Sequence, residues 1–129
     1  MMWLPPSIKA AGIYIFTDIY YNKWDAPAGM ARGRVSNVVD CAFSPSQKEA
    51  EKLYMQCWNY AVSYPLDGII MEGQRTFQLK KTAFDRVNVR RLFLHLEKEV
   101  SRIAKYFLYE GNTAFLRGRF VDTIRPIFD

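Results

Sequence analysis

The sequence predicts an α/β fold, α+β in the stricter usage, in which a small mixed β-sheet of about four strands is flanked by helices. A β-branched run at residues 35–43 is followed at once by a helix start. Two further strand-like runs, at 60–64 and 69–77, flank a turn sequence. One long helix, at 90–109, carries the clearest three-four apolar spacing in the chain. Strands that alternate with helices are typical of layered α/β architectures.

The N-terminal part is expected to form a short buried helix over residues 8–20. Pro5-Pro6-Ser7 places prolines where a first helical turn tolerates them. The β-branched Ile13 and Ile15 leave a strand possible in the same stretch. Residues 21–34 then lose the apolar periodicity, so we expect a long, irregular connection there, of the kind that often forms interfaces.

The middle of the chain supplies a second helix and two strands. Ser44-Pro45-Ser46 predicts a helix start, with the helix covering residues 47–56. Pro65-Leu66-Asp67-Gly68 suits a tight turn. The strands at 60–64 and 69–77 therefore form a hairpin or occupy separated positions in one sheet.

A last short strand at 86–89 is expected to run into the long helix. Apolar residues at helical spacing predict that one face of this helix lies against the core. They are Val89, Phe93, Leu96, Val100, Ile103 and Phe107. Gly111-Asn112 is expected to end the helix with a left-handed stop, and a final helix covers 113–128.

Length and composition predict one globular domain covering residues 1–129 with one core. The chain has 129 residues, of which 50% are hydrophobic and 16% aromatic, enough apolar mass for a packed interior. The net charge of +5 favours an acidic partner surface without saying whether that surface is nucleic acid, membrane or protein.

The cysteines and the N-terminus exclude several classes of protein. Cys41 and Cys57 lie in apolar stretches, so free thiols are expected rather than a disulfide. The sole histidine, His95, is far from both in sequence, which argues against zinc, and no cofactor is expected. No leader-like segment and no apolar run of about 20 residues are present, so we expect no membrane partner and a chain that stays in the cytosol where it is made.

A row of basic residues follows one face of the long helix. Its members recur at three-four spacing: Arg91, His95, Lys98, Arg102 and Lys105. One interpretation is a solvated face opposite the core, with Glu97 and Glu99 lying off the row and neutralising it only partly. The other is a docking strip for an acidic surface. A second basic set lies on the final helix, at Arg117, Arg119 and Arg125.

The sequence offers no active site, and an enzyme is not expected. A Ser or Cys nucleophile needs a base within hydrogen-bond reach, and His95 lies among cations with no orienting carboxylate implied. The carboxylates are scattered, and no phosphate-binding loop occurs.

A small basic nucleic-acid-binding module is the alternative function. Against it, the aromatic residues fall at core spacing and are not interleaved with Arg and Lys.

Three segments in order carry a family resemblance. In the first, Trp3-Leu4-Pro5-Pro6-Ser7 leads through Ala11-Gly12-Ile13 to Thr17-Asp18 and Trp24-Asp25-Ala26-Pro27-Ala28. The second runs from Gly68-Ile69-Ile70 to Glu72-Gly73-Gln74-Arg75-Thr76. These segments resemble the family of contractile tail sheath proteins, which includes the sheaths of myophage tails and of R-type pyocins; the second resembles the family's strand and its Gly-x-Arg-Thr element.

The third segment, Phe84-Asp85-Arg86-Val87-Asn88-Val89-Arg90-Arg91, resembles the family's Asn-Val-Arg-Arg helix start, and Tyr109-Glu110-Gly111-Asn112 its helix end. Two positions depart from the pattern: Ile8 stands where a glycine is common, and Gly111 where a proline is usual. Together the three segments span nearly the whole chain.

The resemblance implies a structural subunit of the virion tail, assembled in the host cytoplasm. Its expected partners are other sheath subunits, in six-fold rings that stack helically, and the inner tail tube protein; no nucleic acid is expected. Contraction of the sheath would drive the tube through the host envelope. The chain would be the C-terminal, tube-facing domain of a larger subunit, present as a fragment, a trimmed form or a split reading frame. The resemblance also implies that terminal strands of neighbours add to its sheet.

Overall fold

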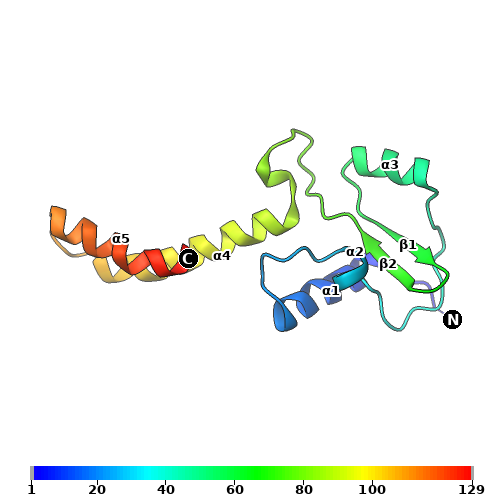
Figure 1. Cartoon of the computed structure of the whole chain (residues 1–129), viewed down its shortest axis with the longest axis horizontal. Coiled ribbons are helices and arrows are strands. Elements are labelled where there is room, and N and C mark those ends of the chain that lie inside the picture. Colours follow the sequence, from blue (N-terminus) through cyan, green and yellow to red (C-terminus); the bar gives the residue numbers. More distant parts are fainter. Residues whose placement is uncertain (1, 129) are drawn as a thin grey trace. The chain divides into compact units, whose positions relative to one another are not determined.

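The computed structural model describes residues 2–128, which form helices and one small hairpin (Figure 1). The elements in chain order are α1 (Pro6–Tyr20), α2 (Gly29–Arg32), α3 (Gln47–Met55), β1 (Tyr60–Tyr64), β2 (Gly68–Glu72), a 3₁₀ turn (Ala83–Asp85), α4 (Val87–Ala104), a second 3₁₀ turn (Lys105–Phe107) and α5 (Ala114–Phe128). The chain divides into two compact units, one ending at Arg91 and one beginning at Leu92. The prediction of a mixed helix and sheet fold with one long helix is confirmed.

The hairpin forms where the Asp-Gly turn predicts it. β1 and β2 pair antiparallel, with Tyr60 opposite Glu72 and Tyr64 opposite Gly68. Gly68 enters β2 with φ +80°, a conformation that glycine adopts without a steric penalty. Across one face of the hairpin, the Tyr64 hydroxyl donates to Glu72 Oε1 at 2.7 Å, and this hydrogen bond raises the pKa of Tyr64.

Among residues 2–128 the sheet has two strands, so the prediction of about four is not confirmed. The run at 35–43 is not a strand, although the residue before it, Arg34, forms a single bridge to Ile70. Asn37 interrupts the run with φ +57°, and Val39 is 82% exposed. The strand expected at 86–89 is reduced to a bridge between Arg75 and Arg86, because α4 already begins at Val87.

The first helices begin where proline and serine predict. α1 has Pro6 in its first turn, and residues 8–20 are helix rather than strand. Its buried members are Ile13 and Thr17, and the Thr17 hydroxyl donates to the Ile13 carbonyl at 2.8 Å. The rest of α1 is largely exposed, contrary to the buried helix expected there.

α3 begins with a capping box formed by Ser46 and Glu49. The Glu49 carboxylate accepts from the Ser46 backbone N–H at 2.9 Å and from the Ser46 hydroxyl at 2.7 Å. These two hydrogen bonds hold the pKa of Glu49 below its ordinary value. The helix start predicted at Ser44-Pro45-Ser46 is therefore confirmed.

The apolar row on the long helix is not buried, which corrects the expectation that it faces a core. None of its six residues is buried, and Phe93 is 49% exposed. Every member after Val89 lies in the second unit, whose elements are all helical. The packing that this unit does supply includes Phe107, whose ring meets that of Phe120 edge to face at 5.2 Å.

The stop predicted at Gly111-Asn112 is also wrong. Gly111 has no positive φ, and the regular helix ends earlier, at Ala104, by tightening into a 3₁₀ turn. α5 then starts after Thr113, whose hydroxyl accepts from the Leu116 backbone N–H at 3.2 Å. The final helix at 113–128 is confirmed.

Among the residues described, the buried apolar side chains all lie in the first unit. They are Ile13, Cys57, Ile69, Ile70 and Met71. Both cysteines are free thiols, as expected. The described part of the chain thus has a core of a few side chains centred on β2.

Close backbone approach to β2 depends on glycine at two places. A Cβ on Gly33 would lie 2.5 Å from the Met71 carbonyl oxygen, so a side chain there would push the Arg34 bridge away from β2. Gly73 follows β2 with φ +84°, and a Cβ there would lie 2.9 Å from Asn59 Oδ1. At Gly68, by contrast, φ is equally unusual but nothing lies within 4 Å.

We predict that Gly73→Ala lowers the free energy of unfolding by roughly 2–3 kcal/mol, because it adds a steric conflict to the left-handed backbone penalty. Gly68→Ala, which carries only the backbone penalty, should cost about 1 kcal/mol. Urea denaturation followed by tryptophan fluorescence measures both, since Trp3, Trp24 and Trp58 all lie in the first unit. Equal losses for the two variants would show that the contact with Asn59 contributes nothing.

Candidate functional site

A buried ion pair joins the end of the hairpin to the start of the long helix. Arg75 Nη2 lies 3.3 Å from Asp85 Oδ2, and the two side chains are only 5% and 13% exposed. Two backbone hydrogen bonds run beside the pair, from Thr76 N–H to the Asp85 carbonyl and from Val87 N–H to the Gln74 carbonyl, each at 2.8 Å. These hydrogen bonds and the ion pair therefore hold the segments at 73–76 and 84–87 together.

The Arg75 guanidinium is held on its other side by Tyr54. Arg75 Nη1 donates to the Tyr54 carbonyl at 3.3 Å, and the guanidinium carbon lies 5.0 Å from the centre of the Tyr54 ring. The Arg75 backbone is fixed as well, because its N–H donates to Asn59 Oδ1 at 2.8 Å and its carbonyl accepts from Asn59 Nδ2 at 2.9 Å. Arg75 is thereby immobilised from end to end.

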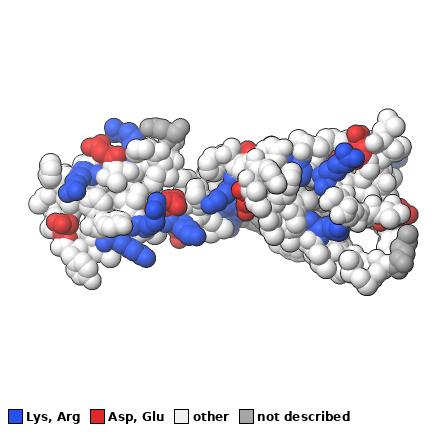
Figure 2. All heavy atoms as spheres, turned by 90° about the horizontal axis from the view of Figure 1, so that it is seen from below, with Lys and Arg blue, Asp and Glu red and all other residues white. Residues whose placement is uncertain are grey.

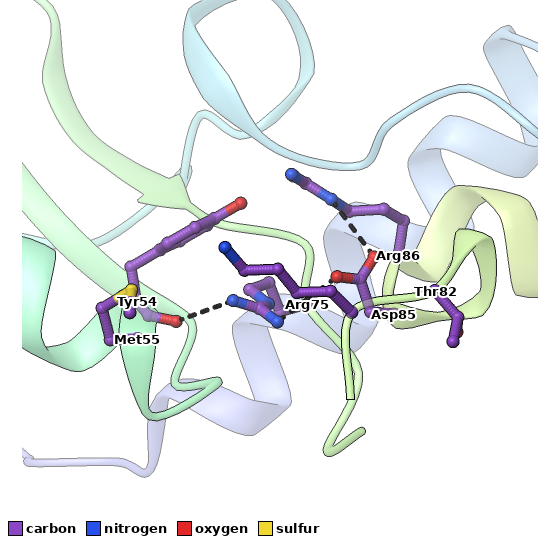
Figure 3. A pocket seen from close by; sticks show the side chains of 7 residues that line it. Tyr54, Met55, Arg75, Thr82, Asp85 and Arg86 are labelled. Atoms are coloured by element: carbon purple, nitrogen blue, oxygen red, sulfur yellow. Dashed lines mark hydrogen bonds and ion pairs between the residues drawn. The ribbon is translucent and has the colours of Figure 1, made fainter. Parts of the chain in front are cut away.

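An open pocket of about 370 Å³ lies at this ion pair (Figure 3). Its lining residues are Tyr54, Met55, Arg75, Lys81, Thr82, Asp85 and Arg86. Arg86 lies at the mouth with its side chain 46% exposed, its Nε 3.5 Å from Asp85 Oδ1 and its guanidinium 5.7 Å from the Tyr54 ring. The pocket is thus basic, with an aromatic wall.

A second ion pair joins α1 to the start of α4. Asp18 pairs with Arg91, whose guanidinium also lies 5.6 Å from the centre of the Tyr14 ring. Burial raises the pKa of Tyr14, and the nearby charge of Arg91 partly opposes that rise. Asp18 and Arg91 come from the first and third of the three segments that carry the family resemblance, and Arg75 and Asp85 from the second and third.

The structure places the five residues of the basic row in different surroundings. Arg91 is engaged by Asp18, with its side chain 17% exposed, and His95 is half-buried and makes contacts within the chain. Lys98, Arg102 and Lys105 are exposed on the second unit, where Arg102 pairs with Glu99 at 2.6 Å.

The second-choice basic set on α5 is exposed but does not form one row. Arg117 and Arg119 are about 200° apart around a helix at 3.6 residues per turn. Arg125 lies 3.7 Å from Asp122, an exposed ion pair. In the view of Figure 2, the basic side chains lie scattered among uncharged and acidic ones rather than merging into one patch.

Large apolar side chains are unusually exposed. On α1, Ile8, Ile15 and Ile19 are 56–68% exposed. On and before α5, Tyr109 and Phe115 are 100% and 80% exposed. Apolar side chains exposed to this extent leave their surface without a cover within the chain. Periodicity in the sequence does not predict this surface, because it shows which residues share a face but not what covers that face.

The described residues show no sign of a metal centre or a membrane span. Within 2–128, no three His, Cys, Asp or Glu side chains come together in a way that could hold a metal ion. None of the helices in that range is both long and apolar enough to cross a bilayer.

Solved structures identify the class of fold. Over 98% of this chain and 35% of theirs, it superposes on subunits of the contracted helical sheath of the anti-feeding prophage, with a TM-score of 0.86 and 24% identity. The contracted sheath complex of the extracellular contractile injection system PVC gives a TM-score of 0.77 at 26% identity, over 94% of this chain and 33% of that one. The fold is that of a contractile sheath subunit.

Curated proteins identify the family, although no family model matches the chain. The tail sheath protein of Enterobacteria phage T4 is 36% identical over 118 residues, 92% of this chain and 18% of that protein. The tail sheath protein of Salmonella phage ViI is also 36% identical, over 126 residues, 98% of this chain and 20% of that protein. The chain belongs to the tail sheath protein family, and it spans about a fifth of the length of these relatives.

We predict that Asp85→Asn lowers the free energy of unfolding by about 3–5 kcal/mol, because it leaves the buried Arg75 guanidinium without a counter-charge. Asp67→Asn, in the exposed hairpin turn of the same unit, is the matched control and should change it by no more than about 0.5 kcal/mol. Urea denaturation at pH 7 provides the comparison. A loss below about 1 kcal/mol at Asp85 would contradict a structural role for the pair.

Proposed function

We propose that the chain is part of a structural subunit of a contractile tail sheath, which polymerises around an inner tube and contracts to drive that tube through a host envelope. The observation that carries the proposal is 36% identity with tail sheath proteins over nearly the whole chain. In this role the chain has no catalytic function and needs no cofactor. The nucleic-acid-binding alternative receives no support from these relatives.

In this proposal residues 1–129 are one domain, the C-terminal, tube-facing domain of a larger subunit. The subunits form six-fold rings that stack helically in the virion tail, after assembly in the host cytoplasm. The exposed apolar side chains of α1 and α5 support the assembly role, because surfaces of this kind are stable in water when another protein covers them.

The open edge of β1 is where a neighbour's terminal strand would join the sheet. β2 is central: Val35 N–H donates to the Ile69 carbonyl at 2.9 Å, and Met71 N–H to the Gly33 carbonyl at 2.8 Å. The backbone N–H and C=O groups of Ile69 and Met71 therefore point away from β1. In the antiparallel pair, those of their partners Ser63 and Ala61 then point away from β2. Ser63 N–H is taken by Ser44 Oγ at 3.1 Å, which leaves Ala61 for strand addition, and added strands would bring the sheet to about four.

The tube contact is assigned to the basic row of α4. Lys98, Arg102 and Lys105 are its candidates for an acidic strip on the inner tube, since Arg91 and His95 are engaged within the chain. Exposed ion pairs are worth under about 1 kcal/mol each and sum to a firm grip only when many subunits engage together. A contact of this kind holds the tube before firing and releases it on contraction.

We predict that reversing Lys98, Arg102 and Lys105 to Glu in the full-length sheath impairs assembly on tubes without unfolding the domain, because all three side chains are exposed. The matched control reverses Arg117, Arg119 and Arg125 on α5, which changes the net charge equally. Electron microscopy of sheath mixed with purified tube counts decorated tubes. Normal decoration by the α4 variant, together with loss in the α5 variant, would move the tube contact to α5.

We further predict that Ala61→Pro abolishes polymerisation while leaving the hairpin intact. Proline removes the N–H that faces away from β2 and is tolerated on an edge strand. Tryptophan fluorescence and circular dichroism check the fold, and sedimentation of the full-length protein measures polymers. A folded variant that polymerises like the parent would exclude the β1 edge as the joint.

A further inference from the structure

The pocket at the Arg75–Asp85 pair has the chemistry of an anion site. Three of its lining side chains are cationic and one is a carboxylate, which leaves a net excess of two positive charges. Arg75, the most buried of the cations, has an Nε atom that is buried and has no hydrogen-bond acceptor among the described residues. That atom is not accessible from the open pocket, so a ligand there meets the exposed charges of Lys81 and Arg86 instead.

The lining favours a carboxylate on a short apolar stem over a phosphate. The Tyr54 ring and Met55 provide an apolar wall against which methylene groups can pack. Arg86 presents a planar guanidinium group, which matches the two oxygens of a carboxylate. The Asp85 carboxylate also lines the pocket, so a doubly charged phosphate would meet stronger repulsion than a singly charged carboxylate.

We propose that this pocket binds the carboxylate of a Glu or Asp side chain from a neighbouring polypeptide, with the exposed side chains of Lys81 and Arg86 as its donors. The source of the side chain, a second sheath subunit, rests on the proposed function; the carboxylate site itself does not. The site differs from the basic row of α4, because its residues come from α3, the end of the hairpin and the segment before α4.

Binding is tested on the chain of residues 1–129, labelled with ¹⁵N, by NMR titration with the blocked tripeptide acetyl-Gly-Glu-Gly-amide. The expected result is saturable shifts, including those of the backbone amides of Lys81 and Arg86, with none from acetyl-Gly-Gln-Gly-amide at equal ionic strength. Lys81→Gln and Arg86→Gln should each weaken binding by about fivefold or more, since each removes a charge-assisted hydrogen bond. Lys80→Gln, an exposed neighbour outside the lining, should leave it unchanged.

Three results would overturn the proposal. Equal shifts with the Glu and Gln peptides, or equal affinity in all three variants, would show that no carboxylate site exists. Saturation by inorganic phosphate but not by the Glu peptide would assign the pocket to phosphate.

The neighbour is tested separately, with Lys81→Glu and Arg86→Glu combined in the full-length sheath. Reduced polymerisation is expected. Normal polymerisation alongside peptide binding would reject a sheath subunit as the source of the carboxylate, and failure of the parent protein to polymerise would reject the proposed function instead.

Discussion

Burial of the Arg75 guanidinium is the constraint on which the rest of the first unit depends. A permanently charged group in the interior must find a counter-charge and acceptors, because desolvation penalises it heavily otherwise. Asp85 supplies the charge, the Tyr54 carbonyl accepts a hydrogen bond, and the Tyr54 ring covers one face. To bring these groups together, the chain turns sharply at Gly73, and α4 begins at Val87, two residues after Asp85.

A buried charge pair of this kind adds little net stability, because the desolvation of both ions offsets much of their attraction. With so few buried apolar side chains, packing alone would tolerate several placements of α3 and of the segment before α4. The Arg75 contacts select one of them, since each involves a particular atom of a particular neighbour. In this protein a polar network determines how these segments are placed, as a large apolar core does in other proteins.

Local sequence signals predicted those elements whose determinants are local. The capping box of Ser46 and Glu49 and the Asp67-Gly68 turn each involve residues a few positions apart, and both are in the structure as expected. The run at 35–43 failed as a strand because β-branched residues favour a pleated, half-buried surface, and no such surface receives Val39.

The candidate sites were harder to predict, because their geometry depends on residues distant in sequence. The basic row was visible as a helical spacing, yet nothing local indicates that Asp18 pairs with Arg91, 73 positions away. The Arg75–Asp85 pair spans ten positions with no helical period between them. Its only sequence signal was the position of both residues within segments that resemble one family.

Because few of its apolar side chains are buried, the stability of this chain depends on its concentration. A protein that keeps most of its apolar side chains at the surface gains stability chiefly when partners cover them, and mass action then links folding to association. In the proposed sheath, its melting temperature would be higher in the assembled state than in dilute solution. Such a sheath would be built from individually marginal parts and still be durable as a whole.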